Sequence, residues 1–190
     1  MFREFILTLI EHQKQFLVLG NLSAVHSGDI FPFIKSNALW LGHNHSNMWF
    51  KIPESYPLTD SQFKTDNEGN RYISFASIRW FTNLKSSKKK PFLPLTKSYS
   101  SESYRKFVNY DKAINVDKIC DIPADYTGEM GVPLTFLDKH NPEQFEVIAI
   151  PIAGCIKYTG YKPRYILYGR DKGKIANYRR CFLRSIQSRT

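Results

Sequence analysis

The chain has 190 residues, of which 42% are hydrophobic and 23% charged. This composition is typical of a globular protein, and it excludes a disordered chain and a membrane-embedded one. Cys120, Cys155 and Cys181 are odd in number and widely spaced, which favours reduced thiols and a cytoplasmic protein over a disulfide framework. The longest apolar runs, such as residues 5–10, are far too short to cross a bilayer and lack a cleavage site, so we expect no membrane partner and no secretory signal.

Positive charge is concentrated in the last forty residues. Residues 1–150 contain 17 lysines and arginines against 16 acids, whereas residues 151–190 contain 10 against the single acid Asp171. We therefore expect a nearly neutral body over residues 1–150 and a basic, β-like segment over residues 151–190 that packs on the same domain. Such a concentration favours a polyphosphate partner, because each neutralised phosphate releases counterions. A solubilising tail is the alternative.

The first forty residues predict alternating helices and strands. Residues 2–14 have apolar side chains at helical spacing, and residues 16–19 form an apolar run typical of a strand buried on both faces of a parallel sheet. Residues 29–36 predict a short helix that Asp29 could cap and in which Pro32 is tolerated near the start. Residues 38–41 predict a second strand, and this order is that of an α/β fold.

The next part of the chain is richer in strands. Residues 48–52 and 71–83 are aromatic and β-like, and the turn signal at residues 66–70 predicts a hairpin excursion that ends in an antiparallel strand. Residues 85–90 are a basic loop, and residues 101–107 predict a short helix. Residues 145–150, 164–168 and 178–186 predict further strands, the last two around a turn at residues 169–173.

The stretch from residue 109 to residue 150 is the least ordinary in the chain. Pro123, Gly128, Gly131 and Pro133 interrupt an apolar sequence. Glycine permits backbone conformations closed to other residues, and proline fixes its own φ and removes a donor. We therefore expect a long, shaped loop packed on a scaffold, a kind of loop that often carries binding function. An ordinary surface loop is the alternative.

The same stretch carries a family resemblance. The segments INVDK at 114–118 and DIPADYTGEMGVPLTFLDKHNPEQFEVI at 121–148 resemble the signature region of the EcoRI-type family of DNA adenine-N6 methyltransferases. Further segments resemble the family in the same order, namely FREFILTLIEHQKQFLVLGN, DIFPFIKSNALWLG, WFKIP and SIRWFTNL. The resemblance covers about residues 1–150, and it is specific because several motifs agree in order.

The resemblance implies a Rossmann-like sheet with two diagnostic loops. One is a glycine-rich turn that approaches S-adenosylmethionine, and the other is an Asn-Pro-Pro-Phe loop that holds the flipped adenine. This chain has neither two adjacent prolines nor a Gly-x-Gly arrangement. In the family the FREFI segment closely follows the Asn-Pro-Pro-Phe loop. We therefore expect an α/β fold that is the second half of the Rossmann-like methyltransferase sheet, with β-rich insertions and a basic C-terminal segment.

Candidate site residues follow from these placements, and none of them is assigned a catalytic role. Asn21, at the end of a strand, and Trp80, Phe81 and Asn83 are candidates for the pocket of the target base, because aromatic rings stack on bases. A turn-forming asparagine and aromatic core packing are the alternatives. The candidates for the recognition loop are Asn115, Asp117, Asp121, Asp125 and Tyr126, whose other role would be to hold the loop by hydrogen bonds. The candidates for phosphate contact are Lys88, Lys89, Lys90, Arg164, Arg170, Lys172, Lys174, Arg179, Arg180 and Arg184.

Other chemistries are weakly supported. His43 and His45 could share one face of a strand, but zinc needs three or four ligands and no cysteine or further histidine lies near them in sequence, so we expect no metal. Cys120 has no histidine close by, which argues against a thiol nucleophile.

Two functions of different classes fit these observations. The first is the DNA-facing half of a site-specific DNA adenine-N6 methyltransferase of a restriction–modification system, dependent on S-adenosylmethionine and inactive alone. The second is a non-catalytic DNA-binding module, or a subunit that complements a separate S-adenosylmethionine-binding chain. The expected partners are double-stranded DNA and such a chain, and self-association is plausible where a sheet edge is exposed.

Overall fold

The structure is a computed structural model. It describes residues 2–42, 48–57, 63–85, 90–107, 110–150 and 180–186, together with the backbone of residues 166–167 and 175–176. The fold is mixed α/β, strand-rich and poor in helix. Within the described residues, no helix is both long and apolar enough to cross a membrane.

The N-terminal part forms a three-stranded antiparallel sheet with the order β1-β6-β2. Its strands are β1 (Leu17–Asn21), β6 (Ile78–Thr82) and β2 (Trp40–Leu41). The predicted first helix is confirmed as α1 (Phe2–Glu11), which buries Ile6. It is followed by β1 and by the 3-10 helix η1 (Leu22–His26).

Two predictions for this part are wrong. The strand at residues 16–19 is not buried on both faces in a parallel sheet, because β1 pairs antiparallel with β6 and leaves Leu17 52% and Leu19 39% exposed. Asp29 does not cap the following helix, α2 (Phe31–Lys35), whose N-cap is Ile30 without a side-chain hydrogen bond. Pro32 does lie at the start of α2, as predicted.

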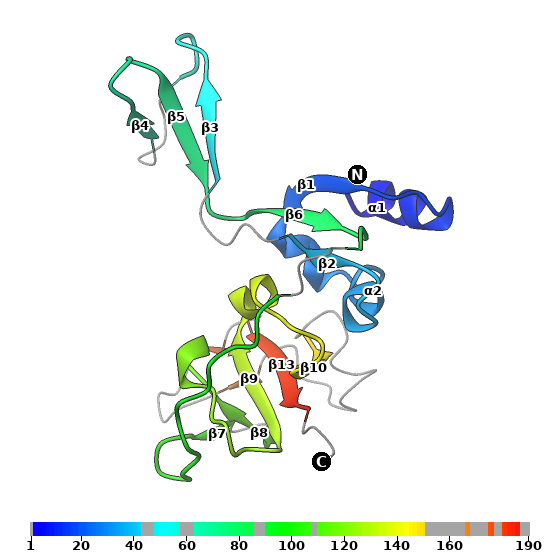
Figure 1. Cartoon of the computed structure of the whole chain (residues 1–190), viewed down its shortest axis with the longest axis vertical. Coiled ribbons are helices and arrows are strands. Elements are labelled where there is room, and N and C mark those ends of the chain that lie inside the picture. Colours follow the sequence, from blue (N-terminus) through cyan, green and yellow to red (C-terminus); the bar gives the residue numbers. More distant parts are fainter. Residues whose placement is uncertain are drawn as a thin grey trace.

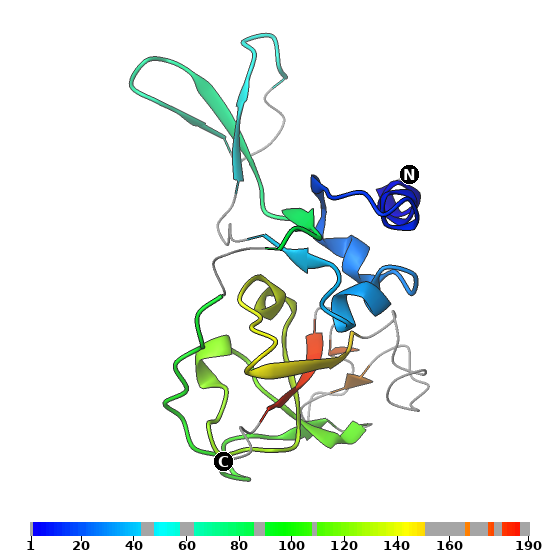
Figure 2. The ribbon, with the colours of Figure 1, turned by 45° about the vertical axis from the view of Figure 1, so that its right-hand side comes forward.

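A three-stranded antiparallel arm projects from this sheet (Figures 1 and 2). Its strands, in the order β3-β5-β4, are β3 (Met48–Ile52), β5 (Arg71–Phe75) and β4 (Phe63–Thr65). The predicted excursion is therefore confirmed. In its turn, Asp66 Oδ1 accepts hydrogen bonds from the backbone of Glu68 and Asn70, and Gly69 has a φ of 84°. The single strand predicted over residues 71–83 is divided instead between the arm and β6.

The C-terminal part is a five-stranded mixed sheet with the order β10-β13-β9-β8-β7. Its strands are β7 (Lys106–Phe107), β8 (Tyr110–Asn115), β9 (Glu129–Pro133), β10 (Phe145–Ala149) and β13 (Arg180–Ser185). Only β8 and β9 pair in parallel within this sheet. The 3-10 helices η2 (Ile119–Asp121) and η3 (Leu134–Asp138) connect its strands, and β11 (Ile166–Leu167) pairs with β12 (Ile175–Ala176) nearby in sequence.

Two further predictions are corrected here. Residues 109–150 were expected to be a loop on a scaffold, but they supply β8, β9 and β10 and are themselves much of the scaffold. Gly131 lies inside β9. A Cβ at this position would be 2.5 Å from Cζ of Phe107, so the glycine allows that ring to pack closely against the strand. The short helix expected over residues 101–107 is instead a turn, stabilised by the Ser100 hydroxyl accepting from the Ser103 amide, followed by β7.

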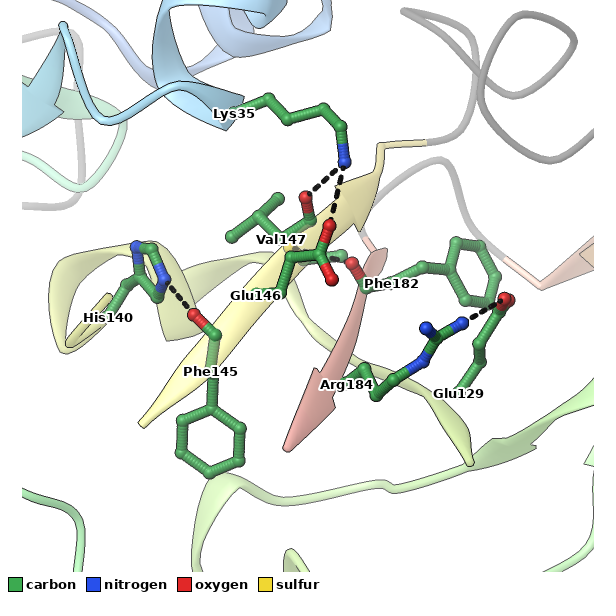
Figure 3. Close-up of polar contacts among 9 residues, drawn as sticks. Lys35, Glu129, His140, Phe145, Glu146, Val147, Phe182 and Arg184 are labelled. Atoms are coloured by element: carbon green, nitrogen blue, oxygen red, sulfur yellow. Dashed lines mark hydrogen bonds and ion pairs between the residues drawn. The ribbon is translucent and has the colours of Figure 1, made fainter. Parts of the chain in front are cut away.

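One core joins the two sheets. It includes Phe81 of β6, Phe31 of α2, Phe136 of η3 and Leu183 of β13. Lys35 also connects α2 to β10, since its Nζ donates to the carbonyl of Val147 at 3.0 Å and lies 3.4 Å from Oε1 of Glu146 (Figure 3). Because β13 lies between β10 and β9, this part of the basic segment is a central strand.

Candidate functional site

A cavity of about 290 Å³ lies where the N-terminal sheet meets η3 and the start of β10. Its lining combines aliphatic, aromatic, charged and amide side chains. The lining residues are Ile34, Asn37, Leu39, Trp40, Leu41, Asn83, Leu84, Lys85, Lys90, Leu137, His140, Asn141, Pro142 and Glu143.

Lys90 is the partly buried cation of this cavity. Its Nζ donates to the carbonyl of Leu137 at 3.2 Å and lies 5.6 Å from the ring centroid of Trp40. Trp40 Nε1 in turn donates to the carbonyl of Leu84 at 3.1 Å. Burial lowers the pKa of Lys90 to about 8, against a smaller opposing effect of Asp138. Lys90 thus places its cation over the ring of Trp40 in this cavity.

Two further lining side chains, those of His140 and Asn141, are held by hydrogen bonds to the backbone. His140 Nε2 lies 2.8 Å from the carbonyl oxygen of Phe145, so Nε2 carries the proton and donates (Figure 3). Burial lowers the pKa of His140. Asn141 Nδ2 donates to the carbonyl of Lys90 at 2.7 Å, and its Oδ1 accepts from the amide of Glu143 at 2.8 Å. Sequence reasoning missed Trp40, His140 and Asn141, because only tertiary packing brings them together.

The four residues predicted for the base pocket lie in different surroundings. Asn21 caps η1 by accepting from the amide of Ser23 at 2.9 Å, and Phe81 is fully buried. Trp80, next to Phe81 on the strand, faces the other side of the sheet and is partly exposed. Asn83 alone of the four lines the cavity, and its amide accepts from the amide of Phe16 at 2.9 Å and donates to the carbonyl of Lys14 at 2.8 Å.

Two of the predicted recognition residues share a network with a predicted phosphate contact. Asn115 Nδ2 and Arg180 both donate to Asp117 Oδ1 at 2.9 Å. Arg180 also donates to the carbonyl of Val116 at 2.8 Å. Asn115 Oδ1 is buried and has no hydrogen-bond partner within the described part of the chain. This network ties β13 to the end of β8.

The other three recognition candidates pack against the segment before β7. Asp125 Oδ1 accepts from the amide of Tyr99 at 2.7 Å, and the ring of Tyr126 lies 4.6 Å from that of Tyr99. The carbonyl of Asp121 accepts from the hydroxyl of Tyr104 at 2.7 Å. Burial raises the pKa of both Tyr104 and Tyr126. The contact of Asp125 is a side-chain hydrogen bond to the backbone, of the kind that the loop-holding alternative requires.

Three predicted phosphate contacts fall within the described residues. Besides Lys90 and Arg180, Arg184 lies 3.2 Å from Oε1 of Glu129 (Figure 3). The other seven lie outside the described residues, as do the two histidines weighed as metal ligands; they are Lys88, Lys89, Arg164, Arg170, Lys172, Lys174, Arg179, His43 and His45. The part of the chain that the structure describes contains no cluster of three metal-ligating side chains.

A buried ion pair joins the arm-bearing strand to the C-terminal part. Arg79 Nε donates to both carboxylate oxygens of Asp138 at 3.1 Å. Arg79 also donates to the carbonyls of Ala76 and Ile78 at 2.8 Å. The pair therefore fixes the base of the arm against η3.

The approach to Gly20, near the end of β1, is filled by a side chain. A site for a nucleotide-like cofactor needs a glycine at a strand end that a ligand can approach closely. Gly20 lies near the end of β1, and a Cβ placed there would lie 2.1 Å from Cζ of Phe2. The ring of Phe2 therefore occupies the space beside this glycine.

Comparison with known proteins gives the family. The model of the family described as "Adenine-specific methyltransferase EcoRI" matches residues 1–186. The chain belongs to this family. It is 45% identical over 152 residues to the Type II methyltransferase M.EcoRI of Escherichia coli. This match covers 78% of this chain and 46% of M.EcoRI.

Two mycoplasma proteins give the same picture. The Type II methyltransferase M.MgeORF184P of Mycoplasma genitalium is 45% identical over 154 residues, and M.MpnI of Mycoplasma pneumoniae is 41% identical over 153 residues. Each match covers 78% of this chain and 48% of the relative. The chain thus spans about half the length of the curated relatives it matches. No solved structure matches it.

Proposed function

We propose that this chain is the DNA-facing half of a site-specific DNA adenine-N6 methyltransferase from a restriction–modification system. The observation that carries the proposal is the family match over residues 1–186, together with 41–45% identity to three Type II methyltransferases. The Rossmann-like character of its sheet belongs to the same proposal, as do the roles of the target-base and recognition candidates.

The methyl donor in this proposal is S-adenosylmethionine, held mainly by a segment outside this sequence. Two observations support this division. The sequence has neither a Gly-x-Gly arrangement nor two adjacent prolines, and the approach to Gly20 is filled by Phe2. We therefore expect the chain alone to be inactive.

The sheet edge at β1 offers a place for that donor segment. Within the described strands β1 is terminal in its sheet, so one of its edges is unpaired, and its Leu17 and Leu19 side chains are substantially exposed. Unpaired backbone and exposed apolar side chains at an edge favour association with another strand. The same edge would support self-association.

A second candidate function is a DNA-binding subunit without methyl transfer of its own. The missing diagnostic loops favour it, and the net charge of +10 fits both functions. The two candidate functions predict different results when the S-adenosylmethionine-binding half is added. Methyl transfer is restored only if this chain is half of the enzyme.

Calorimetry with S-adenosylmethionine and a methyl-transfer assay on duplex DNA test the division of labour. We expect no tight cofactor binding and no measurable transfer by the chain alone. We expect transfer to appear when the part of a relative that this chain does not cover is added. Sub-micromolar cofactor affinity of the chain alone would contradict the division. If both halves are folded but the mixture is inactive, the non-catalytic DNA-binding function is favoured.

A further inference from the structure

The projecting arm has two chemically different faces. Its register pairs Trp49 with Ser74 and Lys51 with Tyr72, and pairs Lys64 of β4 with the same Tyr72. Because directly paired residues point to the same side of a sheet, these side chains share one face. The other face carries the apolar side chains Met48, Phe50, Ile52, Phe63, Ile73 and Phe75.

The first face combines exposed aromatic and cationic groups. Trp49 is 42% exposed, and Lys51 and Lys64 are exposed. The Nζ of Lys64 lies 4.5 Å from the ring centroid of Trp49 and 5.6 Å from that of Tyr72. A cation held over two rings is an ordered group, so less of its freedom is lost when it meets an anion.

The charge of the arm is divided between its strands and its turns. The three strands contain Lys51, Lys64 and Arg71 and no acidic residue. Within the described part of the arm, the acids Glu54, Asp66 and Glu68 lie outside the strands. Asp66 accepts from the hydroxyl of Tyr72 at 3.1 Å and from Asn70 at 2.9 Å, so hydrogen bonds hold its carboxylate at the turn.

We infer that the arm face formed by Trp49, Lys51, Lys64 and Tyr72 contacts the phosphate backbone of the DNA substrate. This inference rests on the proposed function and names the surface that meets DNA. Lysines bind phosphates as point charges, and neighbouring rings pack against sugars and base edges. Strands that project from a body enter or follow the grooves of duplex DNA in other β-sheet DNA binders. The arm projects in both views of the molecule (Figures 1 and 2).

The test compares two double variants of the full chain by fluorescence anisotropy with duplex DNA. Lys51→Ala/Lys64→Ala removes both cations of the arm face. Lys106→Ala/Lys112→Ala removes two exposed lysines of β7 and β8, at the other end of the molecule (Figure 1). The arm variant should lose about tenfold or more in affinity and about two units of salt slope, because each phosphate contact contributes about −0.9. The control should retain wild-type binding.

The outcomes separate the inference from the function on which it rests. A wild-type chain that does not bind DNA would contradict both. Wild-type binding with equal affinities for the two variants would overturn the inference alone and leave the proposed function standing.

Trp49 gives a second readout that does not depend on removing charge. DNA should change the tryptophan fluorescence of the wild-type chain, and this change should be lost in Trp49→Phe, which keeps an aromatic ring in the arm. A fluorescence change that persists in Trp49→Phe would overturn the inference. This readout remains valid if the lysine variants melt at a lower temperature than the wild type.

Discussion

Arg79 and Asp138 form a buried ion pair across 59 residues of sequence, with Nε at 3.1 Å from both carboxylate oxygens. The arginine lies in β6, directly after the arm, and the aspartate ends η3. The pair therefore connects the two sheets at the point where the arm begins.

Removing one partner of this pair should destabilise the protein strongly. Asp138→Leu or Arg79→Met leaves one buried charge of the pair without the other, which costs about 3–5 kcal/mol in comparable pairs. The double variant Arg79→Met/Asp138→Leu should recover most of that loss, because neither charge of the pair remains buried. Urea unfolding of the three variants gives the coupling free energy, and strictly additive losses would show that the two residues act independently.

Lys90 should make stability depend on pH in the alkaline range. Burial lowers its pKa from 10.5 to about 8 in the folded chain, so between these two pH values the unfolded state binds more protons than the folded state. The free energy of unfolding therefore rises with pH across that window. Below the window, the burial of the charged Lys90 side chain lowers the stability of the folded chain by its full amount. Lys90→Met should be more stable than the wild type at pH 7, by at most about 3 kcal/mol.

This advantage of Lys90→Met should shrink as the pH rises through that window. Lys112→Met, at an exposed position of β8, controls for general alkaline effects. Thermal melting at several pH values measures the difference between each variant and the wild type. If the difference in melting temperature between Lys90→Met and the wild type does not change with pH, the lowered pKa of Lys90 is contradicted.

Two arginines of β13 should differ in their contribution to stability. The Arg180 side chain is 11% exposed and donates to Asp117 and to the carbonyl of Val116, whereas the Arg184 side chain is 49% exposed beside Glu129. Arg180→Met should cost about 1–3 kcal/mol, because a buried carbonyl loses a charged donor. Arg184→Met should cost less than about 1 kcal/mol, because exposed ion pairs are weak. Denaturant unfolding measures both, and equal losses would rule out the burial argument.

Local periodicity predicted several elements of the fold. The spacing of apolar residues after Phe2 gave α1, and the turn around Gly69 gave the arm. Periodicity could not assign the sheet to which a strand belongs. The apolar run in β1 was expected to be buried on both faces, but its antiparallel position beside β6 leaves Leu17 and Leu19 exposed.

The candidate site was harder to predict, because the roles of its polar residues depend on distant partners. Asn83 lines the cavity, yet its amide is used to hold the chain at Lys14 and Phe16. Gly131 was expected to belong to a long loop, but it lies in β9 and makes room for Phe107, which lies on another strand. Neither partner can be identified from the sequence around the residue itself.

The salt dependence of duplex DNA binding tests the central claim most directly. The wild-type chain is titrated onto labelled duplexes of different sequence, with salt varied between about 50 and 200 mM, a range over which multiple phosphate contacts cost orders of magnitude in affinity. We predict weak binding with little sequence preference and a linear fall of log Kobs with log salt, at about −0.9 for each phosphate contact. Absence of binding at the lowest salt, or binding that does not change with salt, would contradict the account.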